Sequence, residues 1–448
     1  MVVCRAVKAT LVILALSLLD ASATMASERP VRMRFDFGTG GAEAGFTRVT
    51  ADDVYSDARG YGFDFGSRPE CVDRGTRGAI ERDLCTSDRS FFFSVKVPEG
   101  NYRIKATFGD PESATVTTVK AESRRLMVER VETTKGEFQK RTFIVNVRNS
   151  RISSGDEVRL KEREIGALHW DDKLSLELGN TRPALVSLEI DKVEDAITVF
   201  LAGDSTVTDQ QTEPWAAWGQ MLPRFFDAKV AIANHAESGE TLKAFVSERR
   251  VAKMTSQMKP GDFLFIQFTH NDQKPGPNYV EAFTTYKEEL QRLMAEARSR
   301  GATPVLVTSM LRRNFGPDGR IVNTLGDYPE AMRQLAKDEK VALIDLNASS
   351  RVFYEALGPE GSKKAFVHYK AGSFPGQDQE LKDDTHFSPY GAYELARAVA
   401  DGIRRHVPSL RKHLVSDLAP FDPARPDPFD SWSLPATPGR IAPPPAGR

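Results

Sequence analysis

The chain has 448 residues, of which 40% are hydrophobic and 27% are charged. These values are ordinary for globular proteins, and the length suits two domains that each bury a core. Lysine and arginine total 61, and aspartate and glutamate total 62. This balance gives no electrostatic reason to expect nucleic acid or an anionic membrane as a partner.

The first residues have the features of a secretory signal. Arg5 and Lys8 provide positive charge, an apolar run covers 9–19, and residues 21–23 are small enough for a cleavage site. The apolar run is too short to span a bilayer as a stable helix. We therefore expect residues 1–23 to be a signal peptide and the mature protein to be exported, periplasmic or secreted, without a membrane anchor.

Removal of that segment leaves two cysteines, Cys71 and Cys85. A disulfide between them suits an oxidising compartment, and two free buried thiols are an equally open alternative. Neither cysteine has a further cysteine or histidine at the spacing of a zinc site, and His235, His270 and His368 form no metal-binding motif. We therefore predict no metal and no cofactor.

The segment from about residue 32 to residue 190 has the pattern of an all-β domain. Short runs of β-branched and aromatic residues alternate with polar turns, and the clearest runs cover 90–97, 102–108, 116–121, 141–147 and 174–178. Many short strands with polar turns are typical of sandwiches and jelly rolls. We predict a jelly-roll-like β-sandwich domain over residues 29–192.

From Ile197 onward, apolar runs alternate with helix-like segments. The runs cover 197–202, 230–233, 263–268, 304–308 and 341–345. One amphipathic helix is marked by Phe283, Tyr286, Leu290, Leu293 and Ala297, and a last helix by Leu395, Val399 and Ile403. This pattern predicts a three-layer α/β domain of the doubly wound, flavodoxin-like type over 195–416. Nine prolines after residue 419 predict a tail over 417–448 without regular secondary structure.

Polar residues with catalytic chemistry lie where the predicted parallel strands end, which is where such sheets bind ligands. Ser205 suits a nucleophile at the start of a helix, His386 its general base, and Asp383 the group that orients the imidazole. The N–H groups of Ser205 and Gly239 and the amide of Asn271 suit an oxyanion hole. Each residue alone has an ordinary structural explanation, such as a helix cap for Ser205. Their joint placement favours catalysis.

Four blocks make the sequence recognisable: GDSTV from Gly203, N-x-A-x-x-G from Asn234, HND from His270 and D-x-T-H from Asp383. Together they resemble the SGNH (GDSL-type) hydrolases, most closely the rhamnogalacturonan acetylesterases, over 197 to about 407. The resemblance implies the roles just given to the site residues. The preceding segment resembles a galactose-binding-like domain in its stretches FDFG, YGFDFGS, FFFSVKVPEGNY and RPALVSLEI.

Two positions depart from the family pattern. The third block begins with Thr269 where a glycine is usual, and Glu240 and Thr241 follow Gly239 where many members have Arg-Ser. Neither departure touches a catalytic side chain. They bear on the identity of the substrate more than on the reaction.

The resemblance implies a carbohydrate esterase that hydrolyses acetyl esters on a pectic polysaccharide, rhamnogalacturonan, by a Ser-His-Asp mechanism. An acetylxylan esterase or a broad carbohydrate acetylesterase is the alternative enzyme. A polysaccharide-binding protein with an inactive hydrolase domain is the non-enzymatic alternative. The expected partner is an acetylated plant cell-wall polysaccharide, with Thr206, His270 and Lys274 as candidate contacts. The Lys274 ammonium could meet a galacturonate carboxylate, or it could be an ordinary solvated charge.

Overall fold

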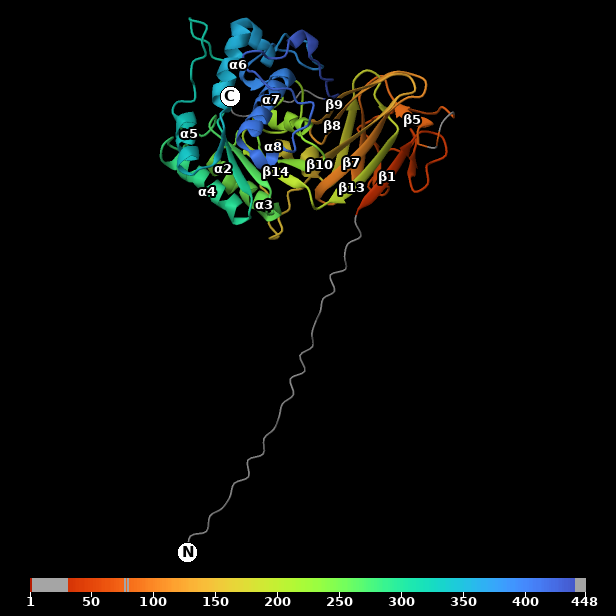
Figure 1. The fold of residues 1–448 in the computed structure, drawn as a ribbon, viewed down its shortest axis with the longest axis horizontal. Helices are drawn as coiled ribbons and strands as arrows, with labels where there is room; N and C mark the ends of the chain where they lie inside the picture. Colours follow the sequence, from red (N-terminus) through yellow and green to blue (C-terminus); the bar gives the residue numbers. More distant parts are fainter. Residues whose placement is uncertain (2–30, 76–77, 79, 440–448) are drawn as a thin grey trace. The chain divides into compact units, whose positions relative to one another are not determined.

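The computed structural model describes residue 1 and residues 31–75, 78 and 80–439. The expected signal peptide over 1–23 lies, apart from Met1, outside the described residues. From Val31 the chain forms one compact unit in which a strand-rich domain precedes a domain of parallel strands and helices (Figure 1). Within the described ranges, no helix has both the length and the apolar composition that crossing a membrane requires.

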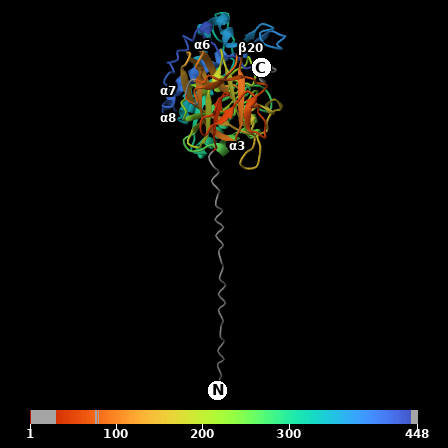
Figure 2. The same ribbon diagram turned by 90° about the vertical axis from the view of Figure 1, so that its right-hand side faces the viewer.

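The N-terminal domain is a sandwich of two five-stranded sheets. Figure 2 shows the strands of this domain nearest the viewer. The first sheet has the order β10 (Phe138–Val147), β7 (Gly100–Gly109), β13 (Ser187–Val193), β1 (Arg32–Phe37) and β2 (Thr47–Val49). The second has the order β3 (Tyr61–Asp64), β6 (Phe91–Lys96), β11 (Lys173–Gly179), β8 (Thr115–Ala121) and β9 (Arg125–Thr133). Both sheets contribute to one apolar core, in which Phe37 and Phe93 meet edge to face with ring centroids 5.0 Å apart.

A small third sheet borders the sandwich, with the order β12 (Ala184–Leu185), β5 (Asp83–Thr86) and β4 (Glu70–Asp73). Cys71 on β4 and Cys85 on β5 are paired across this sheet and are joined by a disulfide. The two 3-10 turns η1 (Glu162–Glu164) and η2 (Leu168–Trp170) precede β11 and become important at the site.

The second domain is built on a five-stranded sheet in which every pair is parallel. Its order is β15 (Val230–Asn234), β14 (Ile197–Gly203), β16 (Phe263–Gln267), β17 (Thr303–Val307) and β18 (Ala342–Ile344). The chain thus runs to one side of β14 and then crosses to the other, which makes the carboxyl end of β14 the point where a crevice opens. This confirms the predicted doubly wound α/β fold.

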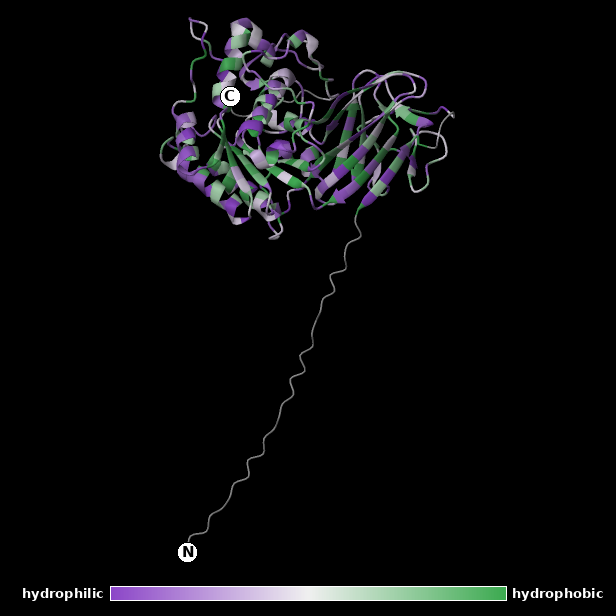
Figure 3. Cartoon of the chain, viewed as in Figure 1, coloured by the Kyte–Doolittle hydropathy of each residue, from purple (hydrophilic) through white to green (hydrophobic). Residues whose placement is uncertain are grey.

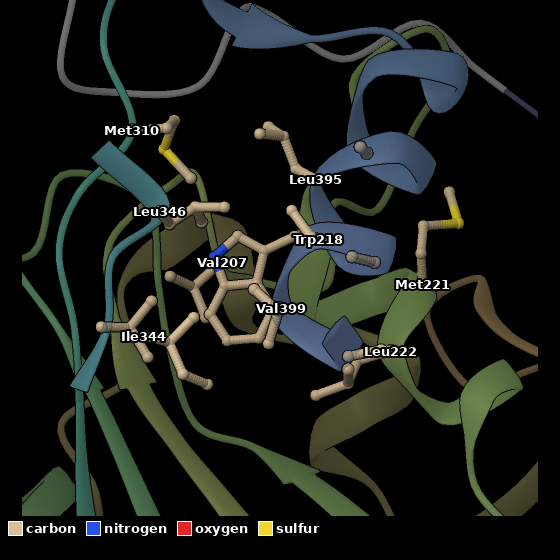
Figure 4. Packing of buried hydrophobic residues seen from close by; sticks show 14 of the residues in the cluster. Val207, Trp218, Met221, Leu222, Met310, Ile344, Leu346, Leu395 and Val399 are labelled. Atoms are coloured by element: carbon tan, nitrogen blue, oxygen red, sulfur yellow. The ribbon is translucent and has the colours of Figure 1, made fainter. Parts of the chain in front are cut away.

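Helices cover both faces of the parallel sheet because its strands are apolar on both sides. Val199 and Leu201 face a core with α1 (Trp218–Met221), α6 (Leu346–Gly361), α7 (Pro389–His406) and α8 (Pro408–Arg411), part of which is shown in Figure 4. Phe200 and Ala202 face the core with α2 (Leu242–Ser247), α3 (Arg250–Gln257), α4 (Thr285–Ser299) and α5 (Tyr328–Asp338). Figure 3 shows the same division, with hydrophobic strands between helices that also carry hydrophilic residues.

Two local predictions are wrong. No helix begins at Ser205, which instead starts a turn in which the N–H groups of Val207 and Thr208 bond to the carbonyl of Asp204. Phe283 is 43% exposed and precedes α4, so it is not part of the buried stripe of that helix. The buried side chains just before α4 are Val280 and Ala282.

The described part of the proline-rich tail, residues 417–439, lies against the protein. Its described residues contain one 3-10 helix, η5 (Phe429–Ser431), where the proline content predicted no regular secondary structure. The Trp432 ring lies 5.6 Å from that of Tyr393 on α7. The Thr437 hydroxyl then donates to Glu177 on β11 at 2.7 Å. The tail therefore contacts both domains.

Candidate active site

Ser205, His386 and Asp383 form one hydrogen-bonded chain. Ser205 follows β14, while the other two residues lie on β20 (Leu381–Phe387), which pairs with β19 (Phe366–Tyr369). The Ser205 Oγ lies 2.8 Å from His386 Nε2, and His386 Nδ1 lies 2.9 Å from Asp383 Oδ2. The three residues are at most 3% exposed. A hydroxyl, an imidazole and a carboxylate in this order can activate the hydroxyl as a nucleophile.

The backbone of β20 fixes the Asp383 carboxylate. Its Oδ1 accepts hydrogen bonds from the N–H groups of Thr385 at 3.0 Å and His386 at 3.1 Å. The adjacent Asp384 has a different environment, because it is paired with Arg313 at 2.7 Å and with His368 at 2.8 Å. Of the two neighbouring aspartates, only Asp383 is in contact with the His386 ring among the described interactions.

A buried hydrogen-bond network holds the turn that carries Ser205. Asp204 Oδ1 accepts from the N–H and the hydroxyl of Thr206, and the Gln267 amide donates to the same hydroxyl at 2.7 Å. Burial raises the pKa of the Asp204 carboxyl, and the Thr206 hydrogen bonds oppose that rise. Thr206 is fully buried and both polar functions of its hydroxyl are used internally. The structure therefore corrects its expected role, because Thr206 supports the turn and is not open to a sugar.

The proposed oxyanion donors come from the loops after β15 and β16. Gly239 has φ +78°, a conformation that glycine adopts without the penalty that a side chain would bring. The Asn271 amide donates to the carbonyl of Glu240 at 3.0 Å, which ties the two loops together. Within the described part of the chain, no acceptor is recorded for the N–H groups of Ser205 and Gly239. Neither N–H group is therefore used by the described backbone hydrogen bonds, as an oxyanion donor requires.

The next residue of the third block, Asp272, also joins these loops. Its Oδ1 accepts the N–H of Leu242, the first residue of α2, at 2.7 Å. Burial raises the pKa of the Asp272 carboxyl to about 7, the Leu242 hydrogen bond opposes this rise, and the charge of Asp204 adds to it. Asp272, the last residue of the HND block, is therefore hydrogen-bonded to the first residue of α2, the helix that follows Gly239.

Two of the candidate substrate contacts, His270 and Lys274, lie in or just after the third block. His270 is 1% exposed, and burial, with the charge of Arg312 as the next cause, lowers its pKa well below the usual range. Burial and the same Arg312 charge also lower the pKa of the Lys274 ammonium. Arg312, which sequence reasoning missed, donates to the His270 carbonyl at 3.2 Å. Arg312 thus contacts the residue before Asn271, and its charge acts on Lys274.

The strand-rich domain also supports the site, through contacts whose residues the sequence pattern did not identify. Arg125 on β9 forms a buried ion pair of 2.6 Å with Asp209, four residues after Ser205. The other carboxylate oxygen of Asp209 accepts from the Asn234 amide at 2.8 Å. Arg124 donates to the Trp215 carbonyl at 2.7 Å. Because 84 or more residues separate each arginine from its partner, no local pattern could reveal these contacts.

One group of side chains in the described residues has the composition of a metal site. Glu164, His169 and Glu237 are buried and bring their ligand atoms within 4.8 Å of one another. However, Arg250 contributes two hydrogen bonds to the Glu164 carboxylate, and Arg163 pairs with Glu237 at 2.7 Å. Both carboxylates are thus paired with arginine side chains of the other domain. These ion pairs account for the clustering of the three residues without a metal ion.

Comparison with known proteins adds to this description. Residues 201–394 match the family model of the GDSL-like lipase/acylhydrolases, and residues 33–149 match that of the β-agarase/YXIM esterase-like, galactose-binding domain-like family. The rhamnogalacturonan acetylesterase RhgT of Bacillus subtilis (strain 168) is 45% identical over 222 residues, which are 49% of this chain and 95% of that protein.

Two further relatives come from the same organism. The probable rhamnogalacturonan acetylesterase YesY is 37% identical over 210 residues, which cover 46% of this chain and 92% of that protein. The crystal structure of the YxiM protein has 26% sequence identity and a TM-score of 0.44, and the match covers 84% of this chain and 98% of that one.

Proposed function

We propose, from the premise that this chain belongs to the GDSL-like lipase/acylhydrolase family, that Ser205, His386 and Asp383 hydrolyse acetyl esters on rhamnogalacturonan. The chain is a carbohydrate acetylesterase of that family, close to the rhamnogalacturonan acetylesterases. The proposal concerns the catalytic residues and the polysaccharide.

The observation that carries the mechanism is the continuous chain from Ser205 Oγ to His386 Nε2, at 2.8 Å, and from His386 Nδ1 to Asp383 Oδ2, at 2.9 Å. Ser205 and His386 are 181 residues apart in the sequence, so the fold alone brings them together. A buried Ser-His-Asp chain of this geometry is the arrangement that activates a serine hydroxyl in unrelated hydrolases.

In the proposed reaction, Ser205 Oγ attacks the acetyl carbonyl carbon while His386 takes the hydroxyl proton. The resulting oxyanion accepts hydrogen bonds from the N–H groups of Ser205 and Gly239 and from the Asn271 amide. Collapse of the intermediate breaks the bond to the sugar oxygen, to which His386 returns the proton. A water molecule, deprotonated by His386, then attacks the acetyl-serine carbonyl. The bond to Ser205 Oγ breaks, acetate leaves, and His386 returns the proton to Ser205 Oγ.

Two observations support rhamnogalacturonan as the polymer. Two relatives, 45% and 37% identical, are named for acetylesterases of this polysaccharide. In addition, Arg312 contacts the His270 carbonyl next to Asn271 and its charge acts on Lys274, and two cations near the third block suit a polymer with carboxylates near its acetyl groups. Acetylxylan, a neutral polymer, is the alternative substrate. A substrate outside the cell would also require the export predicted for residues 1–23.

The mechanism is tested by Ser205→Ala in the full chain, with acetate release measured from acetylated rhamnogalacturonan, xylan and homogalacturonan. We expect this variant to lose more than 99.9% of the activity, about the loss that follows removal of a triad nucleophile. Ser247→Ala, at an exposed serine of α2, is the matched control and should retain full activity. Wild-type acetate release by Ser205→Ala would refute the mechanism, and a preference for xylan would refute the substrate.

A further inference from the structure

Two cations of the strand-rich domain contact the loop that carries Gly239. Lys161 Nζ donates to the carbonyl of Ser238 at 3.2 Å, and Arg163 Nη2 donates to the same oxygen. The same two side chains also hold the carboxylates on either side of this peptide. Arg163 pairs with Glu237 at 2.7 Å, and Lys161 pairs with Glu240. Four contacts therefore link one short segment of the first domain to one loop of the second.

The bonded carbonyl belongs to the peptide group that provides the Gly239 N–H. In a trans peptide the C=O and N–H bonds point in opposite directions within one plane. Donors that fix the Ser238 oxygen on one side therefore also fix where the Gly239 N–H points on the other. Charged donors on the oxygen also polarise the amide and make its N–H a stronger hydrogen-bond donor.

This peptide needs an external restraint because of the residues that flank it. Gly239 has no Cβ and a φ of +78°, so its own side-chain sterics do not select one peptide orientation. The loop lies before α2, outside regular secondary structure, and its internal backbone bond runs from Glu240 N–H to the Glu237 carbonyl. That bond closes the turn but leaves the Ser238 carbonyl to be held by other donors.

The two cations are themselves held in place. The N–H of Lys161 donates to Glu164 Oε2 at 2.9 Å, and the backbone carbonyl of Arg163 accepts from the Gln211 amide at 2.9 Å. Glu164, at the end of η1, is fully buried and is bonded by Arg250 and by the Trp170 indole. The segment that presents the cations is thus anchored to α3 and to the loop after Ser205.

We propose that Lys161 and Arg163 are positioning residues for the oxyanion hole, and that they act from the neighbouring domain by orienting and polarising the Ser238–Gly239 peptide. This inference rests on the proposed function, in which the Gly239 N–H stabilises the oxyanion. It assigns the strand-rich domain a part in turnover itself.

The test uses Lys161→Met, Arg163→Met and the double variant in the full chain, because methionine removes the charge and keeps much of the apolar stem. We expect kcat for a chromogenic acetate ester to fall about tenfold in each single variant and about a hundredfold in the double variant, which approaches the loss of one oxyanion donor. KM should stay within twofold. Arg159→Met, at an exposed cation of the same segment, is the matched control and should keep the wild-type kcat.

Two readouts separate positioning from loss of structure. A small alkyl boronic acid, which forms a tetrahedral adduct on serine, should bind more weakly to the variants by the same factor as kcat falls. Arg163→Lys should recover part of the lost kcat, because lysine can still donate to the Ser238 carbonyl. Thermal midpoints measured in parallel identify any variant that fails to fold, and Arg163→Lys and Lys161→Arg then take its place in the comparison.

An unchanged kcat in the double variant, a change in KM alone, or unaltered boronic acid binding would overturn the inference. Loss of activity in Ser205→Ala alongside unchanged kcat in the double variant would refute the positioning role and leave the proposed function intact. Full activity in Ser205→Ala would refute both.

Discussion

The indole N–H of Trp215 donates to Asp383 Oδ2 at 3.3 Å, the same carboxylate oxygen that faces His386 Nδ1. Trp215 is 1% exposed, and its own carbonyl is held by Arg124 of the strand-rich domain. The carboxylate that orients the histidine is therefore itself oriented by a residue 168 positions away in the sequence.

Trp215→Phe should lower kcat on an acetate ester by about tenfold, because a hydrogen bond to a charged group contributes roughly 1.5 kcal/mol. KM should change little, since the indole does not reach the ester in the proposed mechanism. Trp432→Phe is the matched control, because it removes an indole that packs on α7 without a bond to Asp383. Equal kcat values for the two variants would show that the hydrogen bond from Trp215 to Asp383 does not contribute to turnover.

Asn271→Ala should lower kcat by roughly a hundredfold or more and leave the far-ultraviolet circular dichroism unchanged, because it removes one oxyanion donor. The wild-type amide donates one hydrogen to the Glu240 carbonyl, which leaves its second hydrogen for substrate. Steady-state kinetics on a chromogenic acetate measure the effect. A kcat within threefold of wild type would exclude Asn271 from the hole.

Asp272→Asn should change how stability depends on pH. Burial raises the pKa of this carboxyl to about 7 from its ordinary value of 3.8, with the Leu242 bond opposing and Asp204 adding to the rise. Between about pH 4 and pH 7 the native state therefore binds more protons than the unfolded state, so the stability from this group is present at low pH and is lost as pH rises. The amide side chain introduced by Asp272→Asn stays neutral, so the variant should not lose this stability as the pH rises.

Thermal melts at pH 4 and pH 8 check this expectation. The midpoint of Asp272→Asn should match wild type at pH 4 and exceed it by a few degrees at pH 8. Asp57→Asn, at a side chain that is 85% exposed, is the control and should follow wild type at both values. The same offset at pH 4 and pH 8 would contradict the raised pKa.

Lys274→Ala should raise KM for a carboxylate-bearing acetylated polymer more than for a neutral one. Lys274 lies close enough to Arg312 for their charges to interact, and burial and that charge lower the pKa of the ammonium. We expect KM for acetylated rhamnogalacturonan to rise about fivefold, in line with a partly screened charge contact of about 1 kcal/mol, and KM for acetylated xylan to stay within twofold. Equal effects on both polymers would remove the carboxylate contact.

The sequence was sufficient for features that depend on local pattern. Apolar runs predicted each strand of the parallel sheet to within two residues at either end, because strands buried on both faces leave an unbroken apolar signal. The strand-end rule then grouped Ser205, Gly239 and Asn271 at one edge of that sheet. The pairing of Asp383, and not Asp384, with His386 followed from motif spacing.

Features that depend on distant contacts were not predictable. The turn at Ser205 depends in part on a distant residue, because the Gln267 amide donates to the Thr206 hydroxyl that also bonds to Asp204. Arg124, Arg125 and Arg163 resemble ordinary surface cations in the sequence, although each bonds to a loop of the other domain. Their partners become neighbours only after both domains have folded.

The tail after α8 adds a second tether between the domains. The first is covalent, at the three residues between β13 and β14. The second is the run in which Trp432 packs on the helical side and Thr437 bonds to Glu177 on the sandwich. These tail contacts add to the buried ion pairs Arg125–Asp209 and Arg250–Glu164, which also join the two domains. The tail thus reinforces an interface between the domains that also includes the contacts of Lys161 and Arg163 with the loop carrying Gly239.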